Sequence, residues 1–160
     1  MPLSKLTVAN RARLRNNQPR FRTQFDEPEP MGKIRVLLAD DHEVITARVR
    51  AILSEDFDVI GVVNNGYDAI TEVQRLDPDV LVIDISMPVL DGLQAASSLH
   101  SCHVRTKIIF LTVHEDQDYL DAAFSAGASA YVAKSELTTD LVPAIRKAMQ
   151  GERFVSSSIR

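Results

Sequence analysis

The sequence predicts an α/β domain in which helices cover both faces of a parallel β-sheet. The first observation is that five short apolar segments, rich in β-branched residues, alternate with five segments whose apolar residues recur at helical spacing. The second is that turn-forming residues, such as Asn64-Asn65-Gly66 and Asp77-Pro78, separate these segments. Strands that alternate with helices connect by right-handed crossovers, so we expect a parallel, doubly wound sheet.

These patterns place the individual elements. The expected strands cover residues 34–39, 58–63, 79–84, 106–112 and 128–133. The apolar positions of the expected helices lie within residues 44–53, 69–76, 92–100, 115–126 and 140–150. Gly127 follows the fourth helix, where a left-handed residue commonly ends a helix. Pro143 falls near the first turn of the last helix, where proline is tolerated best.

The composition indicates one folded domain with a basic N-terminal appendage. The chain has 160 residues, of which 45% are apolar, a common length for one domain. Residues 1–30 carry a net charge of +3 and end in the proline-marked segment DEPEP, whereas residues 31–160 carry −7. We divide the chain into an extension over residues 1–32, expected to be disordered, a domain over residues 33–152 and a short tail over residues 153–160. A domain with this negative charge is not expected to bind nucleic acid directly.

Two interpretations of the extension remain open. In the first, translation begins at Met31, shortly before the first strand. In the second, the extension is a flexible arm whose arginines meet an acidic partner. These arginines are Arg11, Arg13, Arg15, Arg20 and Arg22.

Several features of the sequence favour a cytoplasmic location. No apolar run approaches the roughly 18 residues of a membrane-spanning helix, and the N-terminus lacks the apolar stretch of a signal peptide. Cys102 is the only cysteine, so the chain forms no internal disulfide and suits a reducing compartment. We expect no membrane association.

Polar side chains follow four of the five expected strands. Asp40 and Asp41 follow the first strand, Asp84 ends the third, Thr112 ends the fourth and Lys134 follows the fifth. The carboxyl ends of parallel strands meet at one edge of the sheet, where ligands bind in folds of this class. We therefore expect three carboxylates, a hydroxyl and an ammonium group to lie together.

The chemistry of this group indicates a site for a metal ion and a phosphoryl group. Three neighbouring carboxylates remain ionised only if a cation compensates them. Oxygen ligands in a small site suit Mg²⁺, which often also binds a phosphate oxygen. A carboxylate beside such an ion can act as a nucleophile and form an aspartyl phosphate. Lys134 and Thr112 could then contact the new phosphoryl group as a cation and as a hydrogen-bond donor.

At this point the residues resemble a known family. The chain looks like a response-regulator receiver domain of two-component signalling, and the resemblance covers about residues 33–152. The segments LLADDHEVI and AIRKAMQGERFVS are most similar to receivers of LuxR/NarL/FixJ-type regulators, which precede a helix-turn-helix output domain. The motifs that carry the resemblance are Asp40-Asp41, DISMPVLDG over residues 84–92, Thr112 and Tyr131-Val132-Ala133-Lys134.

The resemblance implies both a fold and a role for each motif. The fold is flavodoxin-like, with five parallel strands in the order 2-1-3-4-5 and five helices. Asp84 is the phosphoacceptor, assisted by Thr112 and Lys134. Thr112 and Tyr131 are the switch pair, and Tyr131 is expected to turn inward when phosphorylation draws Thr112 toward the phosphoryl group. Mg²⁺ is bound by Asp40, Asp41, Asp84 and the backbone carbonyl of Ser86. The chain departs from many receivers in having Ser135, rather than proline, after Lys134.

The expected function is that of a phosphoacceptor with at most weak autophosphatase activity, rather than an enzyme. The implied donor is a histidine kinase or a phosphotransfer protein, and the signal leaves through the surface of residues 115–150 to a downstream protein. A homodimer formed on phosphorylation remains open. One alternative is a truncated or single-domain relative of DNA-binding regulators, although no basic helix-turn-helix segment stands within these 160 residues. Another is an aspartate-nucleophile phosphatase, which requires a second acid two residues after the nucleophile, where this chain has Ser86.

Overall fold

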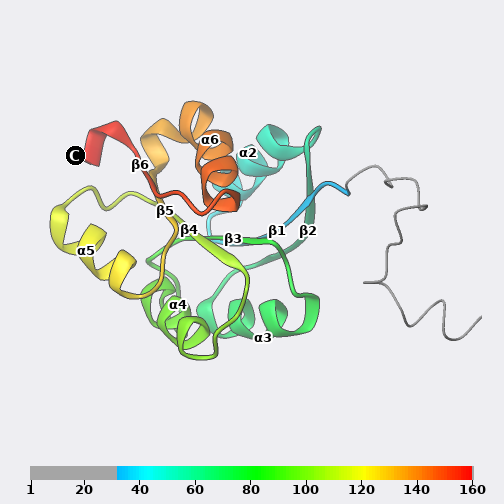
Figure 1. The fold of residues 1–160 in the computed structure, drawn as a ribbon, viewed down its shortest axis with the longest axis horizontal. Helices are drawn as coiled ribbons and strands as arrows, with labels where there is room; N and C mark the ends of the chain where they lie inside the picture. Colours follow the sequence, from blue (N-terminus) through cyan, green and yellow to red (C-terminus); the bar gives the residue numbers. More distant parts are fainter. Residues whose placement is uncertain (1–31, 160) are drawn as a thin grey trace, which may run out of the picture. The chain divides into compact units, whose positions relative to one another are not determined.

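The computed structural model describes residues 32–159, and these form a parallel sheet between two layers of helices (Figure 1). The expectations for the N-terminal extension fall on residues 1–31, outside the described residues. The strands are β1 (Ile34–Ala39), β2 (Phe57–Val63), β3 (Val80–Ile83), β4 (Lys107–Thr112), β5 (Ala130–Ala133) and β6 (Phe154–Val155). The helices are α2 (Glu43–Leu53), α3 (Gly66–Leu76), α4 (Gly92–Ser101), α5 (Gln117–Ser125) and α6 (Leu137–Met149).

The sheet has the order β2-β1-β3-β4-β5-β6, so the parallel, doubly wound topology is confirmed but the expected strand number is wrong. The sixth strand, Phe154–Val155, pairs in parallel with Ala130 and Tyr131 of β5. Sequence analysis assigned this segment to the tail because two residues are too few to show the alternation of a strand. The segment forms a strand because it pairs with β5, and its own sequence carries no strand pattern.

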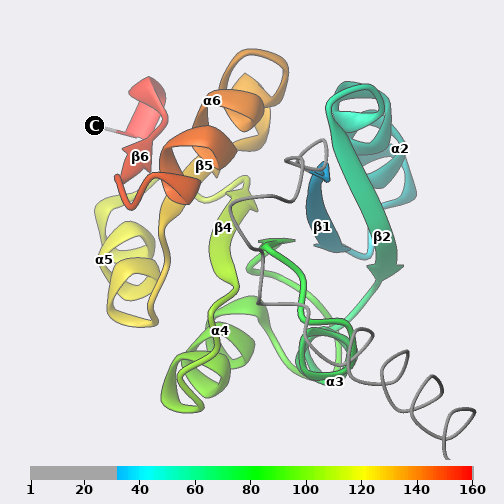
Figure 2. The same ribbon diagram turned by 45° about the vertical axis from the view of Figure 1, so that its right-hand side comes forward.

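Alternation along the strands sends side chains to two separate cores, since successive residues of a strand point to opposite faces. On one side, α3, α4 and α5 cover what we call the Tyr131 face (Figure 2). On the other, α2 and α6 cover what we call the Val132 face. The Tyr131 face contains Leu37, Ala39, Leu81, Ile83, Ile108, Phe110, Tyr131 and Ala133. The Val132 face contains Val36, Leu38, Val80, Val82, Ile109, Leu111, Ala130 and Val132.

Helix ends show which local sequence signals were informative. The Asp91 side chain accepts a hydrogen bond from Gln94 N at 2.8 Å, and the Asp91 backbone N–H donates to Gln94 Oε1 at 3.3 Å, which forms a capping box at the start of α4. Gly127 has φ +98° after α5, as its position indicated. Pro143 lies in the interior of α6 rather than in its first turn, because a 3₁₀ turn over Lys134–Glu136 leads directly into a helix that begins at Leu137.

Within residues 32–159, no helix has both the length and the apolar character needed to cross a membrane.

Candidate functional site

The carboxylates of Asp40 and Asp84 lie side by side because the strands that precede them, β1 and β3, are neighbours in the sheet. Ala39 of β1 is paired with Ile83 of β3, and each strand is followed directly by an aspartate. The backbone N–H of Asp84 donates to the Ala39 carbonyl at 2.9 Å, which fixes the start of the loop after β3. Both carboxylates are buried, with Asp40 7% and Asp84 2% exposed. Two buried acids of the same charge repel each other unless a cation lies nearby.

Lys134 supplies that cation from the far side of the site. Its Nζ lies 2.8 Å from Asp40 Oδ2 and donates a hydrogen bond to Asp84 Oδ2 at 3.1 Å. The lysine side chain is itself only 8% exposed. Because β4 stands between β5 and β3, the long side chain of Lys134 crosses the end of that strand to reach the acids. Sequence analysis placed Asp40, Asp84 and Lys134 at one edge, and the structure brings their charged atoms into contact.

One lysine does not satisfy two buried carboxylates. Within residues 32–159, Asp84 Oδ1 is buried without a hydrogen-bond partner, and Asp40 Oδ2 has only the short ion pair with Lys134. Burial raises the pKa of Asp84, and the charge of Asp40 raises it further, while the charge and hydrogen bond of Lys134 lower it. Burial is the largest of these effects, so the ionised Asp84 is held in surroundings that disfavour its charge.

Asp41 and His42 complete a group of four potential metal ligands. The carboxylate oxygens of Asp40, Asp41 and Asp84 and the Nδ1 atom of His42 all lie within 4.8 Å of one another. The Asp41 side chain is 35% exposed and the His42 side chain 59%, so the group opens to solvent on this side. Three carboxylates, one of them with a buried oxygen that has no partner, form a donor set that fits a small divalent cation.

The loop after β3 is tightly packed against the phosphoacceptor candidate. Gly92 N donates to the Ile85 carbonyl at 2.7 Å, and a Cβ on Gly92 would come within 2.0 Å of the Asp84 carbonyl oxygen. Only glycine allows this approach. The DG pair in DISMPVLDG thus has two local causes, the capping box of Asp91 and the close packing of Gly92. The expected metal ligation by the Ser86 carbonyl stays a prediction.

Comparison with known proteins agrees with this arrangement. The family model of the response regulator receiver domain matches residues 36–146, which is more than half of the chain. The chain belongs to the receiver domain family. It is 36% identical to the response regulator UvrY of Escherichia coli K12 over 128 residues, which are 79% of this chain and 59% of UvrY. The chain therefore spans less than two thirds of this curated relative.

Two solved structures show the same receiver fold. The first is a LuxR-family two-component response regulator from Aurantimonas, with a TM-score of 0.76 and 28% identity, covering 80% of this chain and 93% of that one. The second is the isolated receiver domain of RcsB from Salmonella enterica in the presence of the phosphomimetic BeF₃⁻. Its TM-score is 0.73 at 27% identity, and it covers 80% of this chain and 96% of that one.

The two expected switch residues of the receiver meet at the backbone of His114. Thr112 is fully buried, and its Oγ1 accepts a hydrogen bond from His114 N at 3.1 Å. The Tyr131 hydroxyl donates to His114 O at 2.6 Å. Burial, followed by the charge of Asp116, raises the pKa of Tyr131, so the hydroxyl keeps its proton for this bond. Thr112 and Tyr131 are thus joined through the loop after β4.

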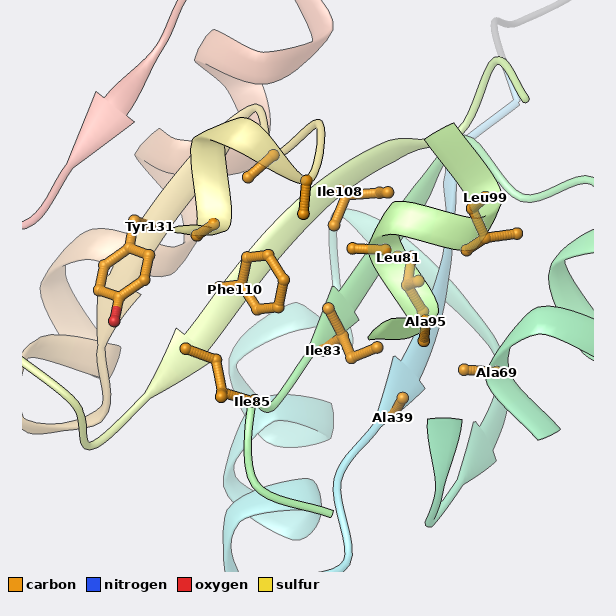
Figure 3. Close-up of a cluster of buried hydrophobic side chains, with 14 of the residues drawn as sticks. Ala39, Ala69, Leu81, Ile83, Ile85, Ala95, Leu99, Ile108, Phe110 and Tyr131 are labelled. Carbon is orange, nitrogen blue, oxygen red and sulfur yellow. The ribbon is translucent and has the colours of Figure 1, made fainter. Parts of the chain in front are cut away.

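The Tyr131 side chain lies inside the core. Its side chain is fully buried, and its ring centre lies 6.4 Å from that of Phe110 in the Tyr131 face (Figure 3). The inward turn of Tyr131 on phosphorylation stays a prediction. In this structure, packing and the bond to His114 O hold the side chain in its buried position.

The structure places two histidines at the site that sequence analysis did not include among the site residues. The ring of His42 contacts the acidic group. His114 is half-buried. Its Nε2 lies 2.9 Å from Ser86 Oγ, and its ring stacks on Tyr119 with centres 4.0 Å apart. The signal available for both was their position, directly after Asp41 and two residues after Thr112.

Ser135, which stands where many receivers have proline, lies in a 3₁₀ turn directly after β5. Every peptide bond of the described residues is trans, and Lys134 begins a 3₁₀ turn. Lys134 still reaches both acids, so the lysine contact does not depend on a proline at position 135.

Proposed function

We propose that this receiver accepts a phosphoryl group on Asp84 from a histidine kinase or a phosphotransfer protein. The observation that supports this most directly is that Lys134 engages one oxygen of Asp84 and leaves the other, Oδ1, without a partner. A buried carboxylate with a free oxygen and a raised pKa is costly to maintain for stability alone. It is well suited to a nucleophile that becomes stabilised when it reacts.

The transfer can be written with the residues of this chain. An oxygen of Asp84 attacks the phosphorus atom of a phosphohistidine, so that a P–O bond forms as the P–N bond breaks and the donor imidazole leaves with its electron pair. The ammonium group of Lys134 remains beside Asp84 and contacts the negative charge of the product. Mg²⁺, when bound, offsets the charge that the carboxylates and the phosphoryl group bring together. Asp40, Asp41, Asp84 and the Ser86 carbonyl are the residues that would hold it.

The test is phosphorylation by acetyl phosphate with Mg²⁺, followed by intact mass spectrometry. We expect one base-labile phosphoryl group on the wild type and none on Asp84→Asn. Asp118→Asn is a matched control, because Asp118 is an exposed acid in the first turn of α5. Equal labelling of wild type and Asp84→Asn would show that Asp84 is not the acceptor.

The signal is proposed to leave through residues 115–150, with Thr112 and Tyr131 as its first steps. A phosphoryl group near the end of β4 offers the Thr112 hydroxyl a new partner, which competes with the bond from His114 N. Since Tyr131 bonds to the carbonyl of the same residue, a shift of His114 alters the anchoring of Tyr131 as well. This is a local charge change that acts on a two-state element.

Thr112→Ala tests this route. The variant should still gain a phosphoryl group on Asp84, because Thr112 is not the nucleophile. It should lose the phosphorylation-dependent change in hydrogen exchange over residues 115–150. A change of wild-type size in the phosphorylated variant would count against Thr112 as the link.

We also infer that the downstream partner of this receiver is a protein surface. The net charge of −7 over residues 31–160 opposes direct binding to nucleic acid. A solved relative is described as RcsB dimers bound to DNA, and this chain covers 66% of that protein. A gel-shift assay with this chain, before and after phosphorylation, distinguishes a protein-directed receiver from a DNA-binding one, and we expect no shift.

A further inference from the structure

The ring nitrogen of His42 points into the acidic group and does not cap the helix α2 that follows. His42 stands at the N-cap position of α2, but its side chain makes no capping hydrogen bond. Its Nδ1 instead lies 2.9 Å from Asp40 Oδ1, 3.3 Å from Asp41 Oδ1 and 3.8 Å from Asp84 Oδ2. A single ring nitrogen therefore approaches all three carboxylates.

We propose that His42 is a nitrogen ligand of the ion bound at this site, so that the receiver favours a first-row transition ion such as Mn²⁺ over Mg²⁺. This inference rests on the proposed function, because it uses the same acidic site. Imidazole is a ligand for transition ions, whereas Mg²⁺ strongly prefers oxygen. A site of three carboxylates and one imidazole therefore favours a different ion from a site of oxygens alone.

The spacing of the ligand atoms supports this assignment. Adjacent ligands of a six-coordinate ion with bonds of about 2.1 Å lie roughly 3 Å apart. The distances from His42 Nδ1 to Asp40 and Asp41, 2.9 and 3.3 Å, have this size. Because the His42 side chain is 59% exposed, an ion can reach the ring from solvent.

The charges and the unpaired oxygen support it independently. Three carboxylates and the ammonium group of Lys134 leave a net charge of −2, which one divalent ion and a neutral imidazole balance. Asp84 Oδ1 is buried and has no hydrogen-bond partner within residues 32–159. The contrasting interpretation is that the ring of His42 only donates hydrogen bonds to the carboxylates, in which case a bound ion displaces it.

The decisive measurement is the nitrogen coupling to bound Mn²⁺, read by pulsed electron paramagnetic resonance on the full chain. Wild type should show the coupling of a directly bound imidazole nitrogen, and His42→Asn should lose it. His114→Asn is the matched control, because His114 is the other histidine beside the acidic site and contacts Ser86. It should retain the coupling.

Titrations with Mn²⁺ and Mg²⁺ give the second measurement. Since losing a supporting residue of a metal site typically costs 10–100-fold in affinity, loss of a ligand by His42→Ala should weaken Mn²⁺ binding by at least about tenfold. Mg²⁺ binding should change by less than about threefold, because oxygen ligands carry most of it. Tighter binding of both ions in His42→Ala would show that the ring competes with the ion and would overturn the proposal.

The outcomes separate this inference from the proposed function. Mn²⁺ that binds without nitrogen coupling, or with coupling lost only in His114→Asn, overturns the role of His42. Phosphorylation of Asp84 with Mg²⁺ would stand in that case. Failure of both ions to bind wild type overturns the metal site itself, and with it the role of His42.

Discussion

Two buried polar clusters of this receiver differ in how completely their groups are paired. At the carboxyl edge, Asp40 and Asp84 share Lys134, and Asp84 Oδ1 has no partner within residues 32–159. Beside β5 and β6, Ser156 is fully buried but well paired. Its Oγ donates to Asp140 Oδ2 at 2.6 Å and accepts from Ala133 N at 3.1 Å, while its N–H donates to the Tyr131 carbonyl at 3.0 Å.

The two clusters differ in what their polar groups contribute: the Ser156 cluster stabilises the fold, whereas the acidic site is incompletely paired and is the candidate site for chemistry. A fully paired polar cluster contributes to stability and fixes a conformation, whereas a partly paired one costs free energy until a ligand completes it. The Ser156 cluster holds β6 against β5. In the proposed function, a cation and a phosphoryl group restore the stability that the acidic site lacks when it is empty. Substitutions in the two clusters should therefore change stability in opposite directions.

The largest effect is expected for Ser156→Ala. Removing Oγ leaves the buried Ala133 N–H without its acceptor and Asp140 without its donor. The free energy of unfolding should fall by about 2 kcal/mol, and Tm by about 6 °C. Ser157→Ala, at an exposed neighbour bonded to Glu136, is the control and should change Tm far less. Equal losses in thermal melts of the two variants would remove the distinction between the clusters.

A smaller effect of opposite sign is expected for Asp84→Asn. Because burial raises the pKa of Asp84 in the folded state, the folded protein holds this proton more tightly than the unfolded chain does. The wild type therefore loses stability as the pH rises from below the ordinary aspartate range to above the raised pKa. Above that range the variant should be more stable by about 1 kcal/mol in the absence of metal ion. Melts across the pH range should show the advantage shrinking as the solution becomes acidic.

The smallest change in stability is expected for Asp41→Ala, because this carboxylate is 35% exposed and solvent screens its repulsion. The free energy of unfolding without metal ion should rise by less than about 0.5 kcal/mol. Affinity for Mg²⁺ should nevertheless fall and phosphorylation should slow, since Asp41 is an expected ligand. Calorimetric titration measures the first, and unchanged affinity would remove Asp41 from the ligand set.

The sequence was sufficient where local patterns decide the structure. Alternation of strands and helices predicted the parallel sheet, and the rule that ligands gather at carboxyl ends predicted the meeting of Asp40, Asp84 and Lys134. The sequence was insufficient where the structure of a segment depends on contacts with another part of the chain. Phe154–Val155 becomes a strand only because β5 offers it hydrogen bonds. Likewise, the orientation of the His42 ring depends on the conformation of the loop after β1, which the pattern of apolar residues does not predict.

The division of the core into two faces has a consequence for how a signal can spread. The sheet acts as a partition: Tyr131 packs in the same compartment as α5 and Ile159, whereas α6 lies in the other. A disturbance that begins at Tyr131 therefore reaches α5 and the 3₁₀ turn Ser157–Ile159 through direct packing. It reaches α6 by two other routes, through the backbone that continues from β5 into Lys134 and through Ser156, which bonds to the Tyr131 carbonyl and to Asp140 of α6. The partition therefore couples the two helices to Tyr131 in different ways, α5 by side-chain packing and α6 by the backbone and hydrogen bonds.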